Sequence, residues 1–415
     1  MTRFEVAVDI GGQTLAAGAA FTHLRHRTLS STFTYAESYL QDTGAYDLEP
    51  ALPLRSGPLF HEGLPYSFRD ASPDRWGRDL IRKQFLAQRN TSGSDGASCE
   101  ITELDYLLRT SDATRQGALR FRSEASADFE APGAAVPKLI KLPELVAAAH
   151  KVAGDTVGQR AGAGDLAAVK TLLEAGTSSL GGARPKASVD DEGTLYMAKF
   201  PHPSDQWDVM RWEKIALDLA EAAGVAVPAN RLLDIDGASV LLLRRFDRGA
   251  DGQRIGYISA LTLLGRPEGE AADYVEIAEA LAPAVEQPTE DLAQLWRRVL
   301  VSVLLHNTDD HLRNHGLLRG GKGWRLSPAF DLNPNPELAT SRATSINGAA
   351  TADTEAEALL RAHEWFGLSE EEARQIAAEV IEALASWRDI AHARGASDAE
   401  IKLFAPVLGR KFGVL

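Results

Sequence analysis

Apolar and polar residues alternate along roughly the first 35 residues of the chain, which is the period of a β-strand. FEVAVDI, LAAGAAFTH and TLSSTFTYA predict three short strands, and Gly11 and Gly12 predict the turn between the first two. Proline and glycine are then frequent until DRWGRDLIRKQFLA, in which four apolar residues recur at helical spacing: Trp76, Leu80, Ile81 and Phe85. The pattern predicts a small N-terminal sheet followed by a helix.

From residue 143 the pattern changes to two helical segments that end at Gly176. TSSLGGARPKASV then leads into a predicted hairpin whose second strand is LYMAKFP, and NRLLDI with ASVLLLRRF predicts another hairpin around a DG turn. Between the two hairpins, Asp208 is placed to cap the helix VMRWEKIALDLAEAAG, and Gly224 is placed to end it. Beyond Asp247 the chain is mostly helical, apart from the hairpin GLLRGGKGWRLSPAF.

The order of these elements predicts an α+β protein, with a sheet-rich part first and a helix-rich part second. Residues 124–138 lose periodicity and accumulate alanine, proline and glycine, which indicates a linker or boundary. We therefore expect three parts, formed by residues 1–125, 126–246 and 247–415.

Composition and charge narrow the function classes. The 415 residues are 44% hydrophobic and 25% charged, as in ordinary soluble globular proteins, and the formal net charge of -14 argues against direct binding to nucleic-acid phosphates. Cys99 is the only cysteine, so one chain contains neither a disulfide framework nor a cysteine-based zinc site. The N-terminus lacks the pattern of a signal peptide and no membrane-length apolar run is present, so we expect a cytoplasmic protein.

The segment HNTDDHLRN, which runs from His306 to Asn314, has the highest density of chemically useful side chains in the sequence. It follows a helix with a buried stripe, and it precedes the hairpin and Asp331. Asp309 and Asn314 stand five residues apart, which is the spacing between the base and the metal-binding amide in a kinase catalytic loop. This layout predicts phosphoryl transfer from ATP, with Asp309 as the catalytic base and Asn314 and Asp331 as Mg²⁺ ligands.

The same segment permits two other interpretations. One is a zinc site formed by His306, His311 and His315 with an aspartate, although no H-E-x-x-H motif is present. The other is a polar loop that caps neighbouring helices and performs no chemistry.

A glycine-rich loop supports the kinase interpretation. In SSLGGARPKAS the small residues Gly181, Gly182 and Ala183 let backbone N–H groups approach phosphate oxygens, and Lys186 could add a positive charge. The loop lacks the Walker spacing, and its place before a hairpin is typical of a kinase glycine loop. Lys199, on the following strand, is the candidate ligand of the nucleotide phosphates.

A kinase lysine of this kind is often oriented by a glutamate on a neighbouring helix. Glu213 is the candidate here, and a solvated surface glutamate is the alternative.

Taken in order, these motifs resemble the HipA-type serine/threonine kinases, which are toxins of bacterial toxin–antitoxin pairs. The resemblance runs from SSLGGARPKASV through AKFP, AEAAGVAVPANRLL and LLLRRFDR to NTDDHLRN and LSPAFDL, and YSFRDASPDRWGR resembles the extra N-terminal subdomain of that family. It implies a two-lobed protein-kinase-like fold, with a sheet-rich N-lobe that carries this subdomain and a mostly helical C-lobe.

The resemblance also implies roles for single residues. The backbone from Leu242 to Phe246, including Arg245, would form the adenine-binding hinge, and Ser179 or the adjacent Ser178 would be an autophosphorylation site that silences the enzyme. Phosphate on that loop would add close to two negative charges where another phosphate is bound, which favours an open state. Asp310 and Arg313 depart from the family pattern, so contacts with the peptide substrate do not transfer to this chain.

The partners that the resemblance implies are ATP, a protein substrate such as an aminoacyl-tRNA synthetase or another translation factor, and a small helix-turn-helix antitoxin that supplies DNA binding. Two alternatives remain open. The chain could be a catalytically silent corepressor subunit, or Asp9-Ile10-Gly11-Gly12 could be the phosphate loop of an actin-like sugar kinase, in which case Asp9 would be essential. A turn role for Asp9 is the simpler interpretation.

Overall fold

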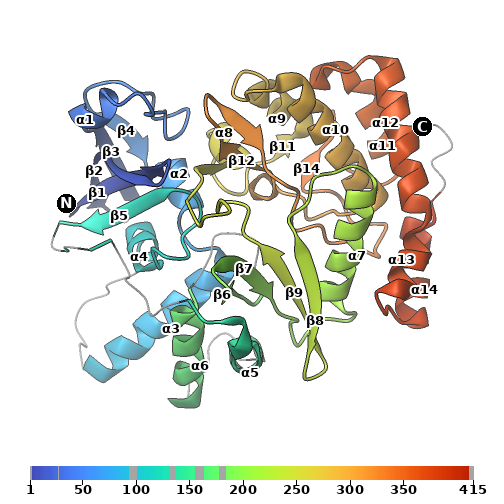
Figure 1. Cartoon of the computed structure of the whole chain (residues 1–415), viewed down its shortest axis with the longest axis horizontal. Helices are drawn as coiled ribbons and strands as arrows, with labels where there is room; N and C mark the ends of the chain where they lie inside the picture. The colour runs from blue at the N-terminus through green and yellow to red at the C-terminus, as the bar shows by residue number, and fades with distance from the viewer. Residues whose placement is uncertain are drawn as a thin grey trace. The chain divides into compact units, whose positions relative to one another are not determined.

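The computed structural model describes residues 2–26, 28–92, 101–124, 126, 128–129, 136–154, 163–176 and 184–410. It divides into two compact units, one formed by Met1–Ser204 with Leu233–Ile258 and the other by Asp205–Leu232 with Ser259–Leu415. Figure 1 shows strands concentrated in the first part of the chain and helices in the last part, which confirms the predicted α+β order. The finer division at residues 125 and 246 stays a prediction.

The first unit begins with a five-stranded sheet of order β4-β3-β2-β1-β5. Its strands are β1 (Thr2–Ile10), β2 (Gln13–Arg25), β3 (Thr28–Tyr35), β4 (Leu59–Glu62) and β5 (Leu119–Ser123). The first three are the predicted strands, and Ile10 stands opposite Gln13 in the antiparallel pair of β1 and β2. Gly11 and Gly12 therefore form a two-residue turn, and their φ values of 57° and 80° explain why both positions are glycine.

One face of this sheet is buried by aromatic side chains. Phe4 of β1, Phe33 of β3 and Phe121 of β5 are fully buried together with Phe68 of the short helix α2 (Tyr66–Asp70). The rings of Phe68 and Phe121 meet edge to face at 5.1 Å. Alternation of apolar residues along the strands places these rings on a single face, and this face is the core of the N-terminal sheet.

A second sheet of the first unit has the order β6-β7-β9-β8. Its strands are β6 (Lys186–Asp191), β7 (Thr194–Lys199), β8 (Asn230–Ile235, which enters this unit at Leu233) and β9 (Ala238–Arg244). Besides α2, the helices of this unit are α1 (Glu37–Leu40), α3 (Arg75–Ser92), α4 (Glu103–Arg109), η1 (Leu139–Lys141), α5 (Leu142–Gly154) and α6 (Ala163–Glu174). Strand β10 (Tyr257–Ser259) follows at the end of the unit.

The core beneath the second sheet joins segments that are distant in sequence. Trp76 of α3 packs in one apolar cluster with Leu145 of α5, Val169 of α6 and Leu242 of β9. The Trp76 Nε1 atom also donates a 3.0 Å hydrogen bond to the carbonyl oxygen of Lys186, at the start of β6. Figure 1 shows α3 and α6 side by side. The helix predicted from DRWGRDLIRKQFLA is thus connected through Trp76 to β6, the strand that follows the glycine-rich segment.

The second unit is mostly helical. Its helices are α7 (Val209–Ala222), α8 (Ala260–Leu263), α9 (Tyr274–Leu281), α10 (Pro288–Leu304), η2 (Leu312–Asn314), α11 (Glu355–Arg361), η3 (His363–Phe366), α12 (Glu370–Ala385), α13 (Trp387–Ala393) and α14 (Asp398–Leu408). Its short strands are β11 (Ala272–Asp273), β12 (Gly316–Arg319), β13 (Trp324–Leu326) and β14 (Thr344–Ser345). Strands β12 and β13 pair antiparallel as the predicted hairpin, and β11 pairs parallel with β14.

Helix α10 leads to the polar segment, and its sequence explains its ends. Pro288 occupies the first turn, where its missing N–H costs nothing, and Glu290 and Asp291 place negative charge at the positive end of the helix dipole. The predicted apolar stripe of α10 is buried, with Trp296 and Val299 fully covered. This packing fixes where α10 ends, and therefore where the polar segment begins.

The predicted cap of α7 is also present, because the Asp208 side chain accepts a hydrogen bond from the N–H group of Arg211. Among the described residues, no helix is both long enough and apolar enough to cross a membrane.

Candidate active site

The polar segment leaves α10 through a sharp change of backbone direction. Leu305 ends the helix, and His306 has a φ of 53°, in the left-handed region that non-glycine residues seldom occupy. The carbonyl oxygen of His306 accepts a hydrogen bond from the N–H group of Asn335, and its Nε2 atom lies 2.9 Å from the carbonyl oxygen of Glu337. The loop is therefore anchored from its first residue, and it continues through η2 into β12.

Asp309 is the exposed residue in a loop whose neighbours are buried. Thr308, Asp310 and Asn314 are each no more than 5% exposed. Partial burial, together with the negative charges of Asp331 and Asp310, raises the pKa of the Asp309 carboxyl, although His311 opposes this shift. A raised pKa makes a carboxylate a better proton acceptor.

Asn314 is bound to the loop that contains Asp309. Its Nδ2 atom donates a 3.1 Å hydrogen bond to the carbonyl oxygen of Asp309. This contact uses the amide nitrogen, and the amide oxygen is the atom that would ligate magnesium. The five-residue spacing seen in the sequence thus corresponds to a direct contact in the fold.

Asp331 follows β13 and has a φ of 59°, another left-handed backbone for a non-glycine residue. Its Oδ1 atom accepts a 3.2 Å hydrogen bond from Nδ2 of Asn333, and the N–H group of Asn333 donates to Oδ1 of Asn307 at 3.2 Å. Asn307 lies in the polar loop, so these contacts connect Asp331 to the loop that carries Asp309. Strained backbone of this kind persists only where surrounding contacts hold it, as they do here.

The residues around Asp331 fit a magnesium ion. Magnesium prefers oxygen ligands, and the Asp331 carboxylate and the Asn314 amide oxygen are both of this kind. In addition, the Oδ1 atom of Asn333 is buried and has no hydrogen-bond partner among the described residues. A buried oxygen without a donor is costly unless an ion or a water molecule satisfies it. The roles of Asn314 and Asp331 as metal ligands stay a prediction, and both side chains carry oxygen atoms of the kind that magnesium binds.

The predicted lysines belong to the first unit. Lys199 is the last residue of β7, a central strand of the second sheet, where it pairs with Lys186 on one side and Leu241 on the other. Both lysines are 3% exposed, and Nζ of Lys186 forms a buried ion pair with Asp74. The sequence did not indicate this pair, which supplies Lys186 with a counter-ion inside its own unit. Their phosphate-binding roles stay predictions.

Glu213 lies on α7 in the second unit and is 1% exposed. This burial disfavours the interpretation of Glu213 as a solvated surface residue. Its role as the orienting glutamate for Lys199 stays a prediction.

The predicted hinge contains a buried charge cluster. Arg245 is 1% exposed, its Nε atom donates a 2.7 Å hydrogen bond to Asp247, and its Nη1 atom donates to the carbonyl oxygen of Thr114 at 3.0 Å. The guanidinium of Arg248 also contacts Asp247. The Arg245 side chain therefore stabilises the first unit, so a nucleotide contact in this segment would involve the backbone or the half-buried Phe246.

Five predicted residues of the glycine-rich segment lie outside the described residues: Ser178, Ser179, Gly181, Gly182 and Ala183. Their predicted roles in phosphate binding and autophosphorylation stay predictions.

Two alternatives lose support from the contacts. For the zinc site, no group of three or more histidine, cysteine, aspartate or glutamate side chains among the described residues could hold a metal ion. For the sugar-kinase loop, the Asp9 carboxylate forms ion pairs with Arg120 and Arg254. The turn role predicted for Asp9 was also wrong, because this residue lies within β1 and Gly11 and Gly12 form the turn. The glycines beside it make a hairpin turn and do not begin a helix.

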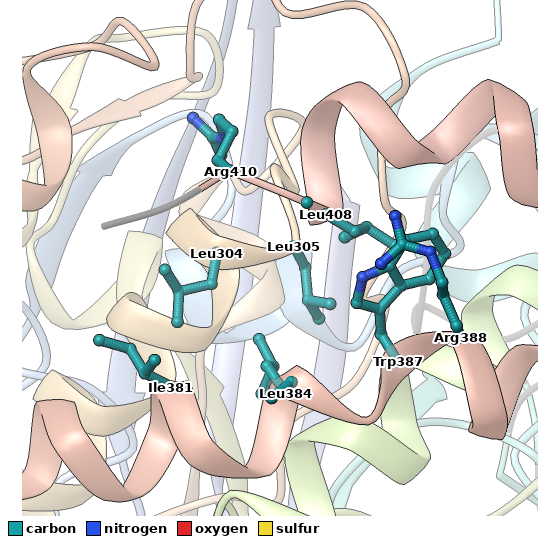
Figure 2. Close-up of a pocket in the computed structure, with 10 residues that line it drawn as sticks. Leu304, Leu305, Ile381, Leu384, Trp387, Arg388, Leu408 and Arg410 are labelled. Carbon is teal, nitrogen blue, oxygen red and sulfur yellow. The ribbon is translucent and has the colours of Figure 1, made fainter. Parts of the chain in front are cut away.

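An apolar pocket of about 380 Å³ lies elsewhere in the second unit. Figure 2 shows Leu304 and Leu305, at the end of α10, facing Ile381 and Leu384 of α12. The remaining wall is formed by Ala385, Trp387, Arg388, Leu408, Gly409 and Arg410. None of the predicted site residues lines this pocket, so it is separate from the proposed chemistry.

Sequence reasoning missed several residues that organise the loop, namely Asn307, Asn333, Tyr274, Arg342 and Glu355. Only Asn307 and Asn333 carried a local signal, because each is an amide close to a predicted site residue. Tyr274, Arg342 and Glu355 reach the loop from segments that are distant in sequence.

Comparisons with known proteins indicate the family of the chain. The family model of the HipA-like C-terminal domain matches residues 178–388, just over half of the chain, and the model of the HipA N-terminal domain matches residues 14–121. "Putative kinase Y4mE" of Sinorhizobium fredii is 24% identical over 357 residues, which cover 80% of this chain and 79% of that protein. "Putative kinase Y4dM" of the same organism is 28% identical over 146 residues, which cover 31% of this chain and about a third (35%) of that protein.

A chain of the Shewanella oneidensis MR-1 toxin–antitoxin complex of HipA, HipB and operator DNA has a similar fold. The TM-score is 0.69 with 15% sequence identity, and the match covers 98% of this chain and 95% of that chain. The two family models account for both the N-terminal and the C-terminal parts, and the fold extends the match to almost the whole length. The chain belongs to the HipA family.

Proposed function

We propose that this chain is an ATP- and Mg²⁺-dependent serine/threonine protein kinase that acts as the toxin of a toxin–antitoxin pair. One observation carries the proposal. Asp309 is exposed between the buried residues Thr308 and Asp310, its carbonyl oxygen is held by Asn314, and the negative charge of Asp331 raises the pKa of its carboxyl. A proton acceptor beside two oxygen ligands is the set of groups that phosphoryl transfer to a hydroxyl requires.

In the proposed reaction, the hydroxyl oxygen of a substrate serine or threonine forms a bond to the γ-phosphorus of ATP. The bond between that phosphorus and the bridging oxygen breaks, and ADP leaves with the bonding electron pair. The hydroxyl proton passes to the carboxylate of Asp309, whose raised pKa suits this step. The products are a phosphorylated protein and ADP.

The remaining roles follow from the predicted sites. Asn314 and Asp331 would hold magnesium, which neutralises charge on the nucleotide phosphates when bound. Lys199, oriented by Glu213, would contact the α- and β-phosphates, and the backbone of Gly181, Gly182 and Ala183 would cover them.

Lys186 would add positive charge near the phosphates. The segment around Arg245 and Phe246 would contact the adenine.

Regulation and partners form a second part of the proposal. Phosphorylation of Ser179 or Ser178 would place charge in the phosphate-binding loop and stop catalysis. The antitoxin would be a small helix-turn-helix protein that binds DNA on behalf of this acidic chain, and the similar Shewanella complex, which contains HipB and operator DNA, supports that arrangement. The substrate would be an aminoacyl-tRNA synthetase or another translation protein in the cytoplasm.

A catalytically silent corepressor is the second candidate, because a kinase-like chain could bind an antitoxin without using ATP. One experiment separates the two. Purified protein is incubated with ATP and Mg²⁺, and phosphate is mapped by mass spectrometry on the chain and on added translation factors. The kinase proposal expects wild type to transfer phosphate, Asp309→Ala to lose transfer, and the exposed control Asp389→Ala to behave as wild type. Absence of ATP use by folded wild-type protein would leave only the corepressor.

A further inference from the structure

Asp310, the immediate neighbour of the proposed base, lies at the centre of a buried hydrogen-bond cluster. Its Oδ2 atom accepts hydrogen bonds from the hydroxyls of Tyr274 and Ser302, the latter at 2.7 Å. Its Oδ1 atom lies 3.1 Å from Nε2 of His315, and Nη1 of Arg342 lies 3.7 Å from Oδ2. Asp310 therefore contacts the start of α9, the last turn of α10, the residue before β12 and the segment before β14.

The two adjacent aspartates have opposite environments. Asp309 is exposed, whereas Asp310 is 3% exposed. Burial alone would raise the pKa of Asp310, but His315, Arg342 and the Tyr274 hydroxyl outweigh it and lower that pKa. An ionised carboxylate in a buried site is tolerated only when donors and cations satisfy it, as they do here. The cluster accordingly holds Asp310 in one position.

The backbone of the same loop is held at every carbonyl from residue 307 to residue 310. The oxygens of Asn307, Thr308, Asp309 and Asp310 accept hydrogen bonds, in that order, from Arg342 Nη1 (3.0 Å), Ala343 N (2.9 Å), Asn314 Nδ2 (3.1 Å) and Thr344 Oγ1 (2.6 Å). Three of the four donors come from residues 342–344. That segment is itself fixed, because Nε of Arg342 donates to the buried Glu355 at 2.9 Å and β14 pairs with β11.

We propose that Asp310 is a positioning residue, which anchors the catalytic loop to Tyr274, Ser302, His315 and Arg342 so that the side chain of Asp309 is presented to the substrate. This inference rests on the proposed kinase function. Ordering a loop residue costs conformational entropy, and these contacts meet that cost during folding instead of during catalysis. A loop anchored in this way keeps the base within the narrow range of positions at which proton transfer is efficient.

The main test compares Asp310→Asn with wild type. The amide has the same shape but loses the charge that faces Arg342 and His315, so the loop should loosen. We expect kcat to fall about 10- to 100-fold, the range that a shift of about 1 Å in a catalytic group produces, with KM for ATP unchanged. In an Asp309→Ala background, Asp310→Asn should cause no further loss, because its effect passes through Asp309. If Asp310→Asn lowers kcat in the Asp309→Ala background by the same factor as in wild type, the proposal is overturned.

A second readout does not depend on activity. Hydrogen exchange measured by mass spectrometry should be at least about 10-fold faster in the peptide containing residues 306–314 of Asp310→Asn, with α7 and α12 unchanged. Unchanged exchange in the loop would refute the positioning role even in an active enzyme. Conversely, a wild-type protein without kinase activity would refute the proposed function, while the exchange result would still report on the loop.

Two further variants control for stability. Asp291→Ala removes a partly buried carboxylate of α10 that accepts a hydrogen bond from the N–H group of Leu326 at 3.0 Å. It should lower the thermal midpoint and leave kcat unchanged, which separates general destabilisation from positioning. If Asp310→Asn does not fold, Tyr274→Phe removes a single donor from the cluster. That variant should show the same pattern with a smaller loss, and wild-type kcat together with wild-type loop exchange in Tyr274→Phe would overturn the proposal.

Discussion

The side-chain amide of Asn314 donates a 3.1 Å hydrogen bond to the main-chain carbonyl oxygen of Asp309. One residue thus has two proposed tasks, since its nitrogen holds the loop of the base and its oxygen would bind magnesium. Asn314→Asp keeps a metal-binding oxygen but loses the donor, whereas Asn314→Ala loses both. We expect phosphoryl transfer to fall about 10-fold or more in the first variant and further in the second. Steady-state rates over a magnesium titration measure both effects, and equal losses in the two variants would contradict the dual role.

Lys199 should contribute to nucleotide affinity. Lys199→Met keeps the length of the side chain and removes the ammonium, so ATP binding should weaken about 10- to 100-fold, the range of one charge-assisted interaction. Isothermal titration calorimetry with ATP and Mg²⁺ measures this change. Lys138→Met is the control, because Lys138 is exposed and pairs with Asp190. ATP affinity equal to that of wild type in Lys199→Met would rule out the phosphate-binding role.

Asn333 should set the magnesium requirement through Asp331. Its amide donates to Oδ1 of Asp331, so Asn333→Ala frees that carboxylate to rotate. Loss of a residue that orients a metal ligand costs about 10- to 100-fold in metal affinity, and we expect a change of that size. Electron paramagnetic resonance of bound Mn²⁺ with ATP measures affinity independently of catalysis. Asn347→Gly, at an exposed turn residue with a φ of 48°, should bind the metal as wild type does.

Glu49 should make the stability of the first unit dependent on pH. Burial raises its pKa to about 7, a shift that hydrogen bonds from Ser67 only partly offset. In the folded state Glu49 therefore stays protonated above pH 4.5, where it ionises in the unfolded chain. The stability of the fold with protonated Glu49 is fully present at low pH and is lost as the pH rises through 7. The free energy of unfolding should fall by about 3 kcal/mol, which follows from a pKa difference of roughly 2.5 units at about 1.4 kcal/mol per unit.

Glu49→Gln should remove that pH dependence, because glutamine keeps an acceptor for the N–H group of Ser67 and carries no charge. In urea unfolding at pH 5, 6, 7 and 8, the free energy of unfolding of the variant should rise relative to that of wild type as the pH rises. Glu62→Gln, at an exposed position, should follow wild type throughout. A wild-type protein whose stability does not fall between pH 5 and pH 8 would refute this account of Glu49.

Gly18 should be intolerant of any side chain. A Cβ atom at this position of β2 would lie 2.2 Å from the carbonyl oxygen of Thr34 and 2.9 Å from the ring of Phe33, so β2 and β3 would have to separate. We expect Gly18→Ala to lower stability by about 1–3 kcal/mol, as overpacked sites do. The matched control is Gly154→Ala, where nothing lies within 4 Å of the added atom. Thermal denaturation of both variants measures the difference, and an unchanged midpoint for Gly18→Ala would contradict the predicted clash.

The sequence by itself determined the secondary-structure elements and the local spacing of the candidate chemistry. The strands of the first 35 residues, the cap at Asp208 and the buried stripe of α10 follow from periodicity and capping, which depend on near neighbours in the chain. The relationship of Asp309 to Asn314 was also predictable, because five residues of one loop separate them. These features are predictable because each depends only on residues that are close together in the sequence.

Only the tertiary structure decided what surrounds these groups. The ion pair of Lys186 with Asp74 joins residues 112 positions apart, and the hydrogen bond of Tyr274 to Asp310 spans 36 positions. No periodicity or motif marks such pairs, because each forms when separate helices and strands pack against one another. Burial then assigns opposite environments to the adjacent aspartates Asp309 and Asp310, since solvent access and nearby charge are properties of the packed chain.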